Sequence, residues 1–418
     1  MSDSNHPPLK DQRVLISGSG IGGLVAAYWL AKAGASVTVL ERASEIRREG
    51  HIIGIRKVAI PIVESMGLGE TLRERMTGEL GLKIVNGLDR AWASIPVSEA
   101  GFTTPLMIHR GELVSALHDV TKDKVSFIYG DSIDTIEEIG DTLCVTLTNR
   151  KSQPLHCDVL LVAEGMRSRT RSKIFDAGSQ APILKLGLVV ASFSHKSDQR
   201  WARCYHIPNQ RAILIRPDRQ GISHAHTICR ASDKLVGPTT SKEQQRGQFL
   251  RLFEKTGWES EKITKDLSEA GDLHIQEVAQ VKCKVWSKGR TVLVGDSAYC
   301  PSPIGGMGAT AAIVGGYLLA AELAKNPADP QAAFRAYEYS LRPWIEFIHK
   351  PGPMVAKRGF PETRFGILSF HLLIHLYFTS PARYVFLWII LILQHLGLLK
   401  SNPPPIPKIP SPSVFNSF

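Results

Sequence analysis

The stretch "RVLISGSGIGGLVAAYWLAKAGASVTVLER", residues 13–42, decides the fold. An apolar strand-like run leads through Gly-x-Gly-x-x-Gly into a helix-like segment, and a second strand ends at Glu41. The glycines permit a tight turn, the approach of a pyrophosphate to the backbone and close helix–strand packing, and the carboxylate suits a ribose hydroxyl pair. The stretch therefore predicts a βαβ unit that binds a dinucleotide, a pattern shared by FAD and NAD sites. The predicted contacts are Gly18, Gly20, Ile21, Gly22, Gly23 and Glu41.

The composition is that of a soluble globular protein, because 43% of the 418 residues are hydrophobic and 21% are charged. This length suggests two domains or one elaborated α/β domain. The net charge of +11 suits solubility and anionic cofactors, and without a concentrated basic patch it does not indicate a nucleic-acid partner. Six cysteines without metal-ligand spacing, and a polar start without a secretory signal, predict no metal site and a cytoplasmic protein.

A second informative stretch is "TVLVGDSAYCPSPIGGMG", residues 291–308. An apolar strand stops at Gly295 and Asp296, prolines and glycines follow, and a buried-looking helix runs from Ala309 to Leu323. A carboxylate at the end of a buried strand costs free energy unless a polar group meets it. Asp296 is therefore either a ligand contact or the N-cap of a helix.

The pattern of strands and helices predicts an α/β fold with three kinds of segment. Residues 13–75, 101–179 and 286–350 are assigned to a discontinuous Rossmann-like domain. Residues 76–100 and 180–285 change character and are assigned to an inserted β-sheet domain that contacts the substrate. Residues 1–12 are expected to be a disordered lead, and residues 351–418 a helical apolar tail with a proline-rich end.

The apolar tail has three possible roles. Its strongest run, "YVFLWIILILQHLGLL" at residues 384–399, is shorter than the roughly 20 apolar residues that span a bilayer. The tail could pack on the dinucleotide domain, form a dimer interface, or attach the protein to a membrane surface through residues 366–399. The sequence does not indicate an oligomeric state.

Three stretches, in the same order along the chain, resemble the motifs of the group A FAD-dependent monooxygenases, the p-hydroxybenzoate hydroxylase superfamily. The first is the glycine motif with Glu41 and Arg42. The second, "EGMRSRTR" at residues 164–171, is similar to the short D-G motif of that family. The third, residues 291–308, is similar to its G-D motif, and "HRGELVSAL" at residues 109–117 also matches. Together the matches run from residue 13 to about 325, and the ordered set is far more specific than any one motif.

The resemblance implies an FAD cofactor and assigns site residues. Asp296 would accept a hydrogen bond from the ribityl chain, Arg110 would contact the phosphate or ribityl region, and Arg56 is a candidate for contact with the flavin ring or a substrate carbonyl, or is an exposed helix arginine. The flavin-site residues that it implies are Arg110, Asp296, Pro303, Gly305, Gly306, Met307 and Gly308. The D-G motif residues are Glu164, Gly165 and Arg171.

The chain departs from the family pattern at three positions. Glu164 replaces the usual aspartate, Tyr299 stands where many relatives have histidine, and Thr310 stands where many have asparagine.

The resemblance also implies an activity. An enzyme of this family uses NAD(P)H and O2 to hydroxylate or epoxidise a small organic substrate, here of aromatic, polyketide or terpenoid type, through a C4a-hydroperoxyflavin. One alternative keeps FAD without oxygen transfer, as in an oxidase, a dehydrogenase or a flavin-containing cyclase. A more remote alternative is a non-catalytic flavin-binding sensor or scaffold. The sequence singles out no catalytic base.

Overall fold

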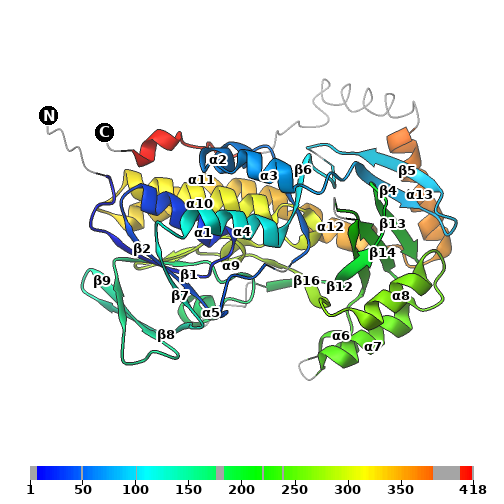
Figure 1. The fold of residues 1–418 in the computed structure, drawn as a ribbon, viewed down its shortest axis with the longest axis horizontal. Helices are drawn as coiled ribbons and strands as arrows, with labels where there is room; N and C mark the ends of the chain where they lie inside the picture. Colours follow the sequence, from blue (N-terminus) through cyan, green and yellow to red (C-terminus); the bar gives the residue numbers. More distant parts are fainter. Residues whose placement is uncertain are drawn as a thin grey trace.

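The computed structural model describes residues 7–48, 50–99, 101–175, 183–218, 221–237, 240–379 and 405–416. The protein is a mixed α/β fold, as predicted, and consists of two parts that lie side by side (Figure 1). We call them the six-stranded part and the seven-stranded part, after their largest sheets. The proposed functional site lies where these two parts meet.

The six-stranded sheet contains the βαβ unit that the sequence predicts. β1 (Arg13–Ser17) lies between β11 (Val159–Val162) and β2 (Ser36–Glu41), and pairs in parallel with both. The apolar residues of these strands are buried because helices cover the sheet, as expected for parallel strands. The full strand order is β17 (Ser287–Lys288), β18 (Thr291–Leu293), β11, β1, β2 and β7 (Ser126–Tyr129).

Helices α1 (Ile21–Lys32) and α10 (Gly308–Lys325) pack closely against each other. A Cβ atom on Gly316 would lie 2.6 Å from the carbonyl oxygen of Gly22, so only glycine permits this approach. α4 (Arg110–Thr121) and α11 (Pro330–His349) extend this helical layer. A small sheet of β10 (Leu155–Cys157), β9 (Thr142–Leu147) and β8 (Ile133–Ile139) completes the core of this part.

The seven-stranded sheet uses two separate segments of the chain. Successive side chains of its inner strands point to opposite faces of the sheet. On one face, Val189, Ala191 and Phe193 pack on helices α7 (Lys242–Phe253) and α8 (Ser260–Glu269). The neighbouring side chains face the other way, toward the six-stranded part. The strand order is β16 (His274–Val281), β12 (Ile183–Lys196), β15 (Ile222–Arg230), β14 (Arg211–Arg216), β13 (Ala202–Ile207), β4 (Gly81–Val85) and β5 (Ala91–Pro96).

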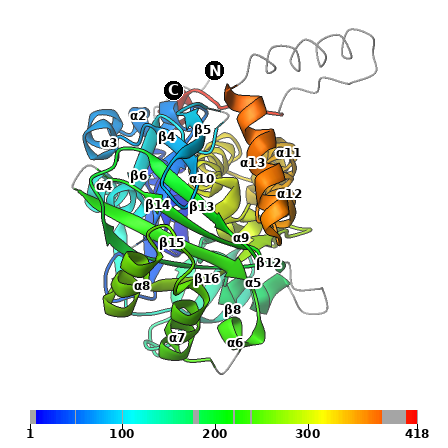
Figure 2. The same ribbon diagram turned by 90° about the vertical axis from the view of Figure 1, so that its right-hand side faces the viewer.

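Shorter elements connect the two parts. The ribbon of β3 (Ile52–Ile55) and β6 (Leu106–His109) leads into α4. The helix α13 lies beside β5 and β13 at one edge of the seven-stranded sheet (Figure 2). The remaining short elements are α2 (Ile60–Ser65), α3 (Gly69–Arg75), α5 (Arg169–Phe175), α6 (Asp233–Val236), α9 (Asp296–Tyr299), η1 (Pro303–Gly305), α12 (Pro351–Arg358), α13 (Arg364–Thr379) and η2 (Pro412–Phe415).

The start of the described chain differs from its prediction. Residues 7–12, expected to be disordered, form a turn in which Leu9 is fully buried and its N–H donates to Ala33 O at 2.9 Å. Residues 1–6 lie outside the described residues. Apolar burial against α1 therefore orders a segment whose polar composition had suggested disorder.

The tail is described only in part. The proline-rich end packs on the six-stranded part, because Phe415 lies 4.6 Å from Trp29, ring to ring, and Tyr317 donates to Pro410 O at 2.7 Å. Residues 384–399 lie outside the described residues. No helix in the described part of the chain is long and apolar enough to cross a membrane. The domain boundaries and the role of the tail stay predictions.

Candidate flavin site

A cavity of about 420 Å³ lies between the carboxyl ends of the six-stranded sheet and the seven-stranded sheet. This is where ligands bind in open α/β sheets, because the loops after the strands converge there. The structure brings most of the residues from all three predicted motifs into its wall. Those that line it are Gly18, Gly20, Ile21, Gly22, Glu41, Arg42, Arg110, Glu164, Gly165, Asp296, Pro303, Gly306 and Gly308.

The first wall of the cavity is the glycine turn before α1. Gly18 has a φ of +111°, and a Cβ atom there would lie 2.4 Å from Ala163 O. Gly23 faces away from the cavity and lets the turn close, since its Cβ would lie 2.1 Å from Gly18 O. Gly20 is the N-cap of α1 and no side chain caps the helix, so its first N–H groups are available at the cavity. This arrangement favours an anion.

A second helix begins at the same cavity. α10 starts after Met307, again without a side-chain cap, and Gly308 and Ala309 line the wall. Two helix N-termini therefore add their partial positive charges in one place. The cationic side chains that line the cavity are Arg42, Arg47, Arg110, Arg167, Arg169 and Arg216. The two helix N-termini and these arginines, except Arg216 on the opposite wall, together suit a pyrophosphate. Met307 itself and Gly305 are not among the lining residues.

Asp296 faces this cavity and is not a helix cap. The N-cap of the short helix α9 is Gly295, at φ +65°, and no cap bond from a side chain is present there in the described structure. Burial raises the pKa of Asp296, while a hydrogen bond from the Cys300 thiol and the charge of Arg110 oppose this rise. The partial exposure of Asp296 is exposure to the cavity. A hydroxyl donor placed in the cavity would compensate the buried carboxylate.

Glu41 is ionised and oriented at the end of β2. Its Oε2 accepts from the backbone N–H of Ser19 at 3.0 Å and from its hydroxyl at 2.8 Å, and its Oε1 accepts from Ala43 N at 2.9 Å. Burial alone would raise the pKa of Glu41, but these hydrogen bonds outweigh it and lower the pKa. The carboxylate thus joins the glycine turn to the second strand, in the place that the motif predicts for a ribose contact.

Hydrogen bonds to the Glu164 carboxylate hold the D-G segment in place. Glu164 accepts from Ser17 Oγ at 2.6 Å, from Ser168 Oγ at 2.7 Å and from Thr170 N at 3.0 Å. The glutamate that replaces aspartate is therefore fully engaged with its own segment and β1. Its extra methylene reorganises the hydrogen bonds without leaving the carboxylate unpaired.

The buried Arg171 ties the D-G segment to the G-D motif. Its guanidinium donates to Met166 O at 2.8 Å and to Ser297 O at 3.0 Å, and Gly165 N donates to Ser297 Oγ at 2.9 Å. Arg171 is 1% exposed and does not line the cavity. Its hydrogen bonds instead hold the turn at Gly165, which does line the cavity.

Arg56 is neither an exposed helix arginine nor a lining residue. It precedes α2 and is 8% exposed, with its backbone N–H bonded to Thr310 Oγ1 at 3.1 Å and its Nη1 to Glu99 O at 2.6 Å. A Cβ atom on Gly306 would lie 3.6 Å from Nη2 of Arg56, so the guanidinium packs next to the glycine turn.

The two other departures from the family pattern make structural contacts. Thr310 accepts the bond from Arg56 and thereby connects α10 to the segment before α2. The hydroxyl of the buried Tyr299 bonds to Tyr337 Oη at 2.8 Å. A Cβ on Gly315 would lie 1.9 Å from the Tyr299 hydroxyl, so a glycine in α10 makes room for the tyrosine.

Sequence reasoning missed the far wall of the cavity. Phe102, Met107, Arg216 and Gln276 line it, and the last two come from the seven-stranded sheet. No motif marks them, because they belong to segments whose pattern is only that of ordinary strands and loops.

Ser302 was also missed, although it lies within a quoted motif. It has a φ of +80°, and its buried Oγ has no hydrogen-bond partner among the described residues. Such backbone strain gathers at functional sites, and an unpaired buried hydroxyl at a cavity wall is suited to a ligand. Asp131 shows the same feature, since its buried Oδ2 is unpaired within the described structure.

These features fit FAD, because they combine a glycine cradle, two uncapped helix N-termini, a buried carboxylate and unpaired polar atoms at one cavity. The comparison with known families agrees, since residues 11–338 match the family described as FAD binding domain. The chain belongs to this family. It is an FAD-dependent monooxygenase, and FAD is its cofactor.

Individual relatives resemble most of the enzyme. It is 32% identical over 378 residues to the monooxygenase CTB7 of Cercospora beticola, covering 85% of this chain and 90% of the relative. It is 31% identical over 388 residues to the flavin-dependent monooxygenase eupH of Phoma sp, covering 85% and 89%. Among solved structures, the tetracycline destructase Tet(51) superposes with a TM-score of 0.72 at 26% identity, over 96% of this chain and 99% of that one.

Proposed function

We propose that this enzyme uses NAD(P)H and O2 to hydroxylate or epoxidise a small ring-bearing molecule of aromatic, polyketide or terpenoid type. The observation that carries the proposal is a cavity in which the flavin-site motifs face a wall supplied by the seven-stranded sheet. When bound there, FAD supplies two-electron redox chemistry and the activation of oxygen. The chain itself has to bind the cofactor, place the substrate and exclude water.

Binding of the cofactor is assigned to the predicted residues. The glycine turn and the N-termini of α1 and α10 would hold the pyrophosphate, and Glu41 the ribose. Asp296 would accept a ribityl hydroxyl, and Arg110 would neutralise the phosphate. Burial lowers the pKa of Arg110, and the negative charge of Asp296 opposes this fall. The cation and the carboxylate therefore interact electrostatically across the cavity.

Placement of the substrate is assigned to the far wall, and the seven-stranded part would be the inserted substrate domain. Arg216 forms a buried two-point ion pair with Glu79, at 3.0 Å for each bond, and its guanidinium lies 4.9 Å from the centre of the Phe102 ring. The pair fixes a cation beside an aromatic face. Such a wall suits an aromatic ring that carries a carbonyl or phenolate oxygen. The name of Tet(51), a tetracycline destructase, agrees with a polycyclic substrate.

We also propose that residues 366–399 attach the enzyme to a membrane surface; in the described structure, residues 366–379 belong to the helix α13. Large apolar side chains are exposed along it, among them Phe365 at 78% and Leu373 at 66%. Arg364 begins the helix, and the sequence continues into the apolar run of residues 384–399. An exposed apolar face next to cations is typical of an interfacial helix. The exposed apolar residues are Phe365, Leu368, Leu372, Leu373, Leu376 and Tyr377.

Sedimentation with anionic lipid vesicles tests this attachment. The double change Phe365→Ser and Leu373→Ser should release the enzyme into the supernatant, while Ile139→Ser, at an exposed position on β8, should leave binding unchanged. A wild-type enzyme that stays in the supernatant at low salt would refute membrane attachment and favour packing or dimer contact.

The monooxygenase proposal is tested with the purified holoenzyme. Under anaerobic conditions, NADPH or NADH should bleach the flavin absorption in the presence of a substrate from a panel of phenols and enolised polyketides. Admitting isotopically labelled oxygen should restore the spectrum and give a product one labelled oxygen atom heavier. Substrate conversion without a labelled atom would replace the proposal with an oxidase, dehydrogenase or cyclase.

A further inference from the structure

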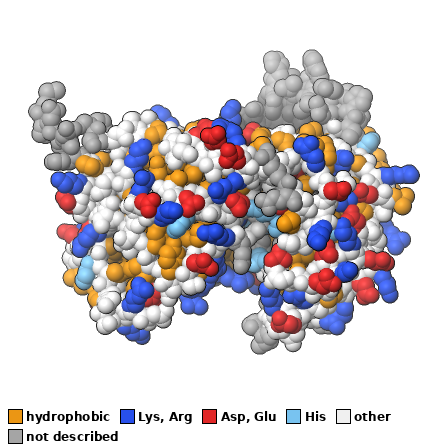
Figure 3. Space-filling model, in the orientation of Figure 1, with side chains coloured by type: hydrophobic (Ala, Val, Ile, Leu, Met, Phe, Trp, Pro, Cys, Tyr) orange, Lys and Arg blue, Asp and Glu red, His pale blue; other side chains and the backbone are white. Residues whose placement is uncertain are grey.

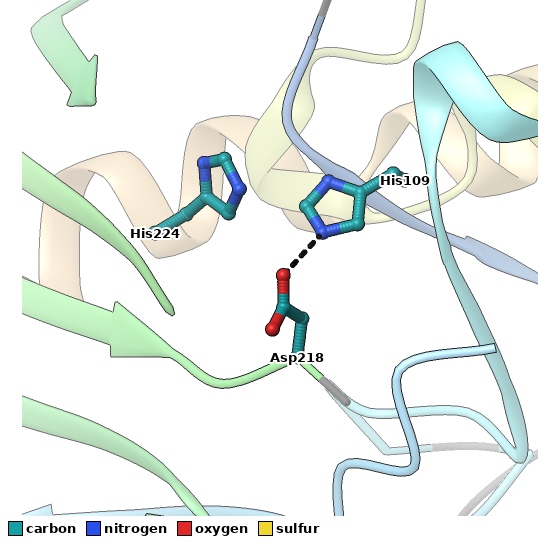
Figure 4. A group of neighbouring side chains, drawn as sticks. All are labelled: His109, Asp218 and His224. Carbon is teal, nitrogen blue, oxygen red and sulfur yellow. Dashed lines mark hydrogen bonds and ion pairs between the residues drawn. The ribbon is translucent and has the colours of Figure 1, made fainter. Parts of the chain in front are cut away.

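Three side chains outside the flavin cavity converge where the two parts meet. His109 ends β6 and precedes α4, Asp218 follows β14, and His224 lies on β15. Figure 4 shows the two imidazoles and the carboxylate directed toward a common space. One nitrogen or oxygen from each residue lies within 4.8 Å of the others. His109 lies more than a hundred residues before Asp218 and His224, which are six residues apart, so only the fold brings the three together.

The geometry of the cluster is that of an open ligand set. His109 Nε2 lies 3.2 Å from Asp218 Oδ2, and the two histidine rings are 4.6 Å apart, centre to centre. Asp218 Oδ1 accepts from Ile222 N at 3.1 Å, which orients the carboxylate. All three side chains are partly buried, so solvent can reach the space between them.

The chemistry of the three groups is matched to a metal ion. Two imidazole nitrogens and one carboxylate oxygen are ligands that Zn²⁺ and other divalent first-row metals accept.

We propose that His109, Asp218 and His224 bind one divalent transition-metal ion, with Zn²⁺ as the representative, and that water completes its coordination. The ion would join the end of β6, just before α4, to β15 and the loop between β14 and β15 in the seven-stranded part. It would lie beside the flavin cavity, because Arg110 follows His109 and Arg216 pairs with His224 across the strands, and both arginines line the cavity. The ligand atoms would need to move closer by roughly an ångström to reach Zn–N and Zn–O distances of about 2 Å.

Metal titration of the FAD-loaded enzyme tests the site. After treatment with a chelator and its removal, ZnCl2 added in a calorimeter should bind with a stoichiometry of one. CoCl2 should give ligand-field absorption at longer wavelength than the flavin bands, as expected for mixed nitrogen and oxygen ligands. Zinc should also raise the melting temperature, because an ion that binds the folded state stabilises it.

Variants assign the binding to these residues. His224→Asn and Asp218→Asn should each weaken Zn²⁺ binding about tenfold or more. His156→Asn, at an exposed position on β10, is the matched control and should leave the affinity unchanged. If either cluster variant lost its flavin or its cooperative melting, His109→Gln would replace it. Absence of stoichiometric binding, or an affinity that none of these variants changes, would overturn the proposal and leave a His–Asp hydrogen bond.

Discussion

The six-stranded and seven-stranded parts meet at one cavity but are specified in different ways. In the six-stranded part the wall is made by backbone, so particular residue types are required at fixed positions, as at Gly18 and Gly23. In the seven-stranded part the wall is made by side chains such as Arg216 and Gln276, which project from ordinary strands. The wall that we propose for the cofactor therefore leaves a motif in the sequence, whereas the wall that we propose for the substrate does not.

The two parts also differ in charged and polar chemistry. The six-stranded part collects helix N-termini and arginines around the cavity, which suits an anionic cofactor. The seven-stranded part contributes Arg216, held by its ion pair with Glu79, together with Gln276 and Glu277. In Figure 3 histidine side chains appear in the hollow between the two parts, while on the rest of this face Lys and Arg are interspersed with Asp and Glu. We expect substitutions in the first part to affect the flavin, and those in the second to spare it.

The largest effect is expected for Gly18→Ala. The added methyl group would meet Ala163 O at 2.4 Å, at a φ that disfavours any side chain. The combined overpacking and strain should cost about 3 kcal/mol or more, with loss of bound flavin. Urea unfolding measures the loss of stability, and the flavin-to-protein absorbance ratio measures the loss of bound flavin.

Gly247→Ala, in helix α7, is the control for Gly18→Ala. No atom lies within 4 Å of the added methyl group, so its stability should be equal to that of the wild type or up to about 1 kcal/mol higher. If the two alanine variants were equally stable and equally loaded with flavin, the backbone requirement at Gly18 would be refuted.

The second effect belongs to the seven-stranded part. Glu79→Gln would leave the buried Arg216 without its counter-charge and should cost about 3 kcal/mol. The folded fraction should keep its flavin, because Glu79 lies outside the flavin motifs. Glu64→Gln removes an exposed pair with Arg73 and should change stability by less than about 1 kcal/mol. Loss of flavin from folded Glu79→Gln protein would show that flavin binding depends on the seven-stranded part as well.

The outcome at particular residues shows what a sequence can predict. Asp296 and Gly18 could be recognised because burial and backbone geometry leave few residue types that work there. Residues 7–12 were expected to be disordered because the burial of Leu9 depends on distant residues; its N–H donates to Ala33 O, just after α1. The Glu79–Arg216 pair joins positions 137 residues apart, and only the fold brings them together. The strain at Ser302 likewise depends on tertiary packing.

A third prediction separates binding from stability at Asp296. Asp296→Asn should weaken FAD binding by about tenfold to a hundredfold, since a hydrogen bond to a charged group contributes roughly 1.5–3 kcal/mol. Because burial raises the pKa of Asp296, its ionised form is disfavoured in the apoprotein. The amide should therefore leave the apoprotein as stable as before, or more stable, at pH 7.

Flavin titration by fluorescence quenching, and thermal melting of the apoprotein, give the two quantities for Asp296→Asn. Asp119→Asn, on the exposed side of α4, is the control and should alter neither. An apoprotein that is destabilised while its FAD affinity is unchanged would make Asp296 a structural residue.

The smallest effect is a pH dependence in the seven-stranded part. His371 of α13 bonds to His206 of β13 at 3.1 Å, and His206 also bonds to Gly359 O at 3.1 Å. Burial lowers the pKa of His206 to about 3 and that of His371 to about 4. Between pH 6.5 and about 4 the unfolded chain therefore binds more protons than the folded protein. Stability should be complete above pH 6.5 and should fall as the pH decreases through this window.

His371→Asn removes one of these two titrating groups while keeping a polar partner for His206. Between pH 7 and pH 5 the variant should lose about 1–2 kcal/mol less stability than the wild type, because each pKa unit corresponds to about 1.4 kcal/mol. Urea unfolding at the two pH values measures the difference, and the exposed His156→Asn should behave as the wild type. If the stability of His371→Asn depended on pH as that of the wild type does, the buried imidazole pair would not make the α13 contact acid-sensitive. The loss of stability at low pH would then have to come from carboxylates in both parts.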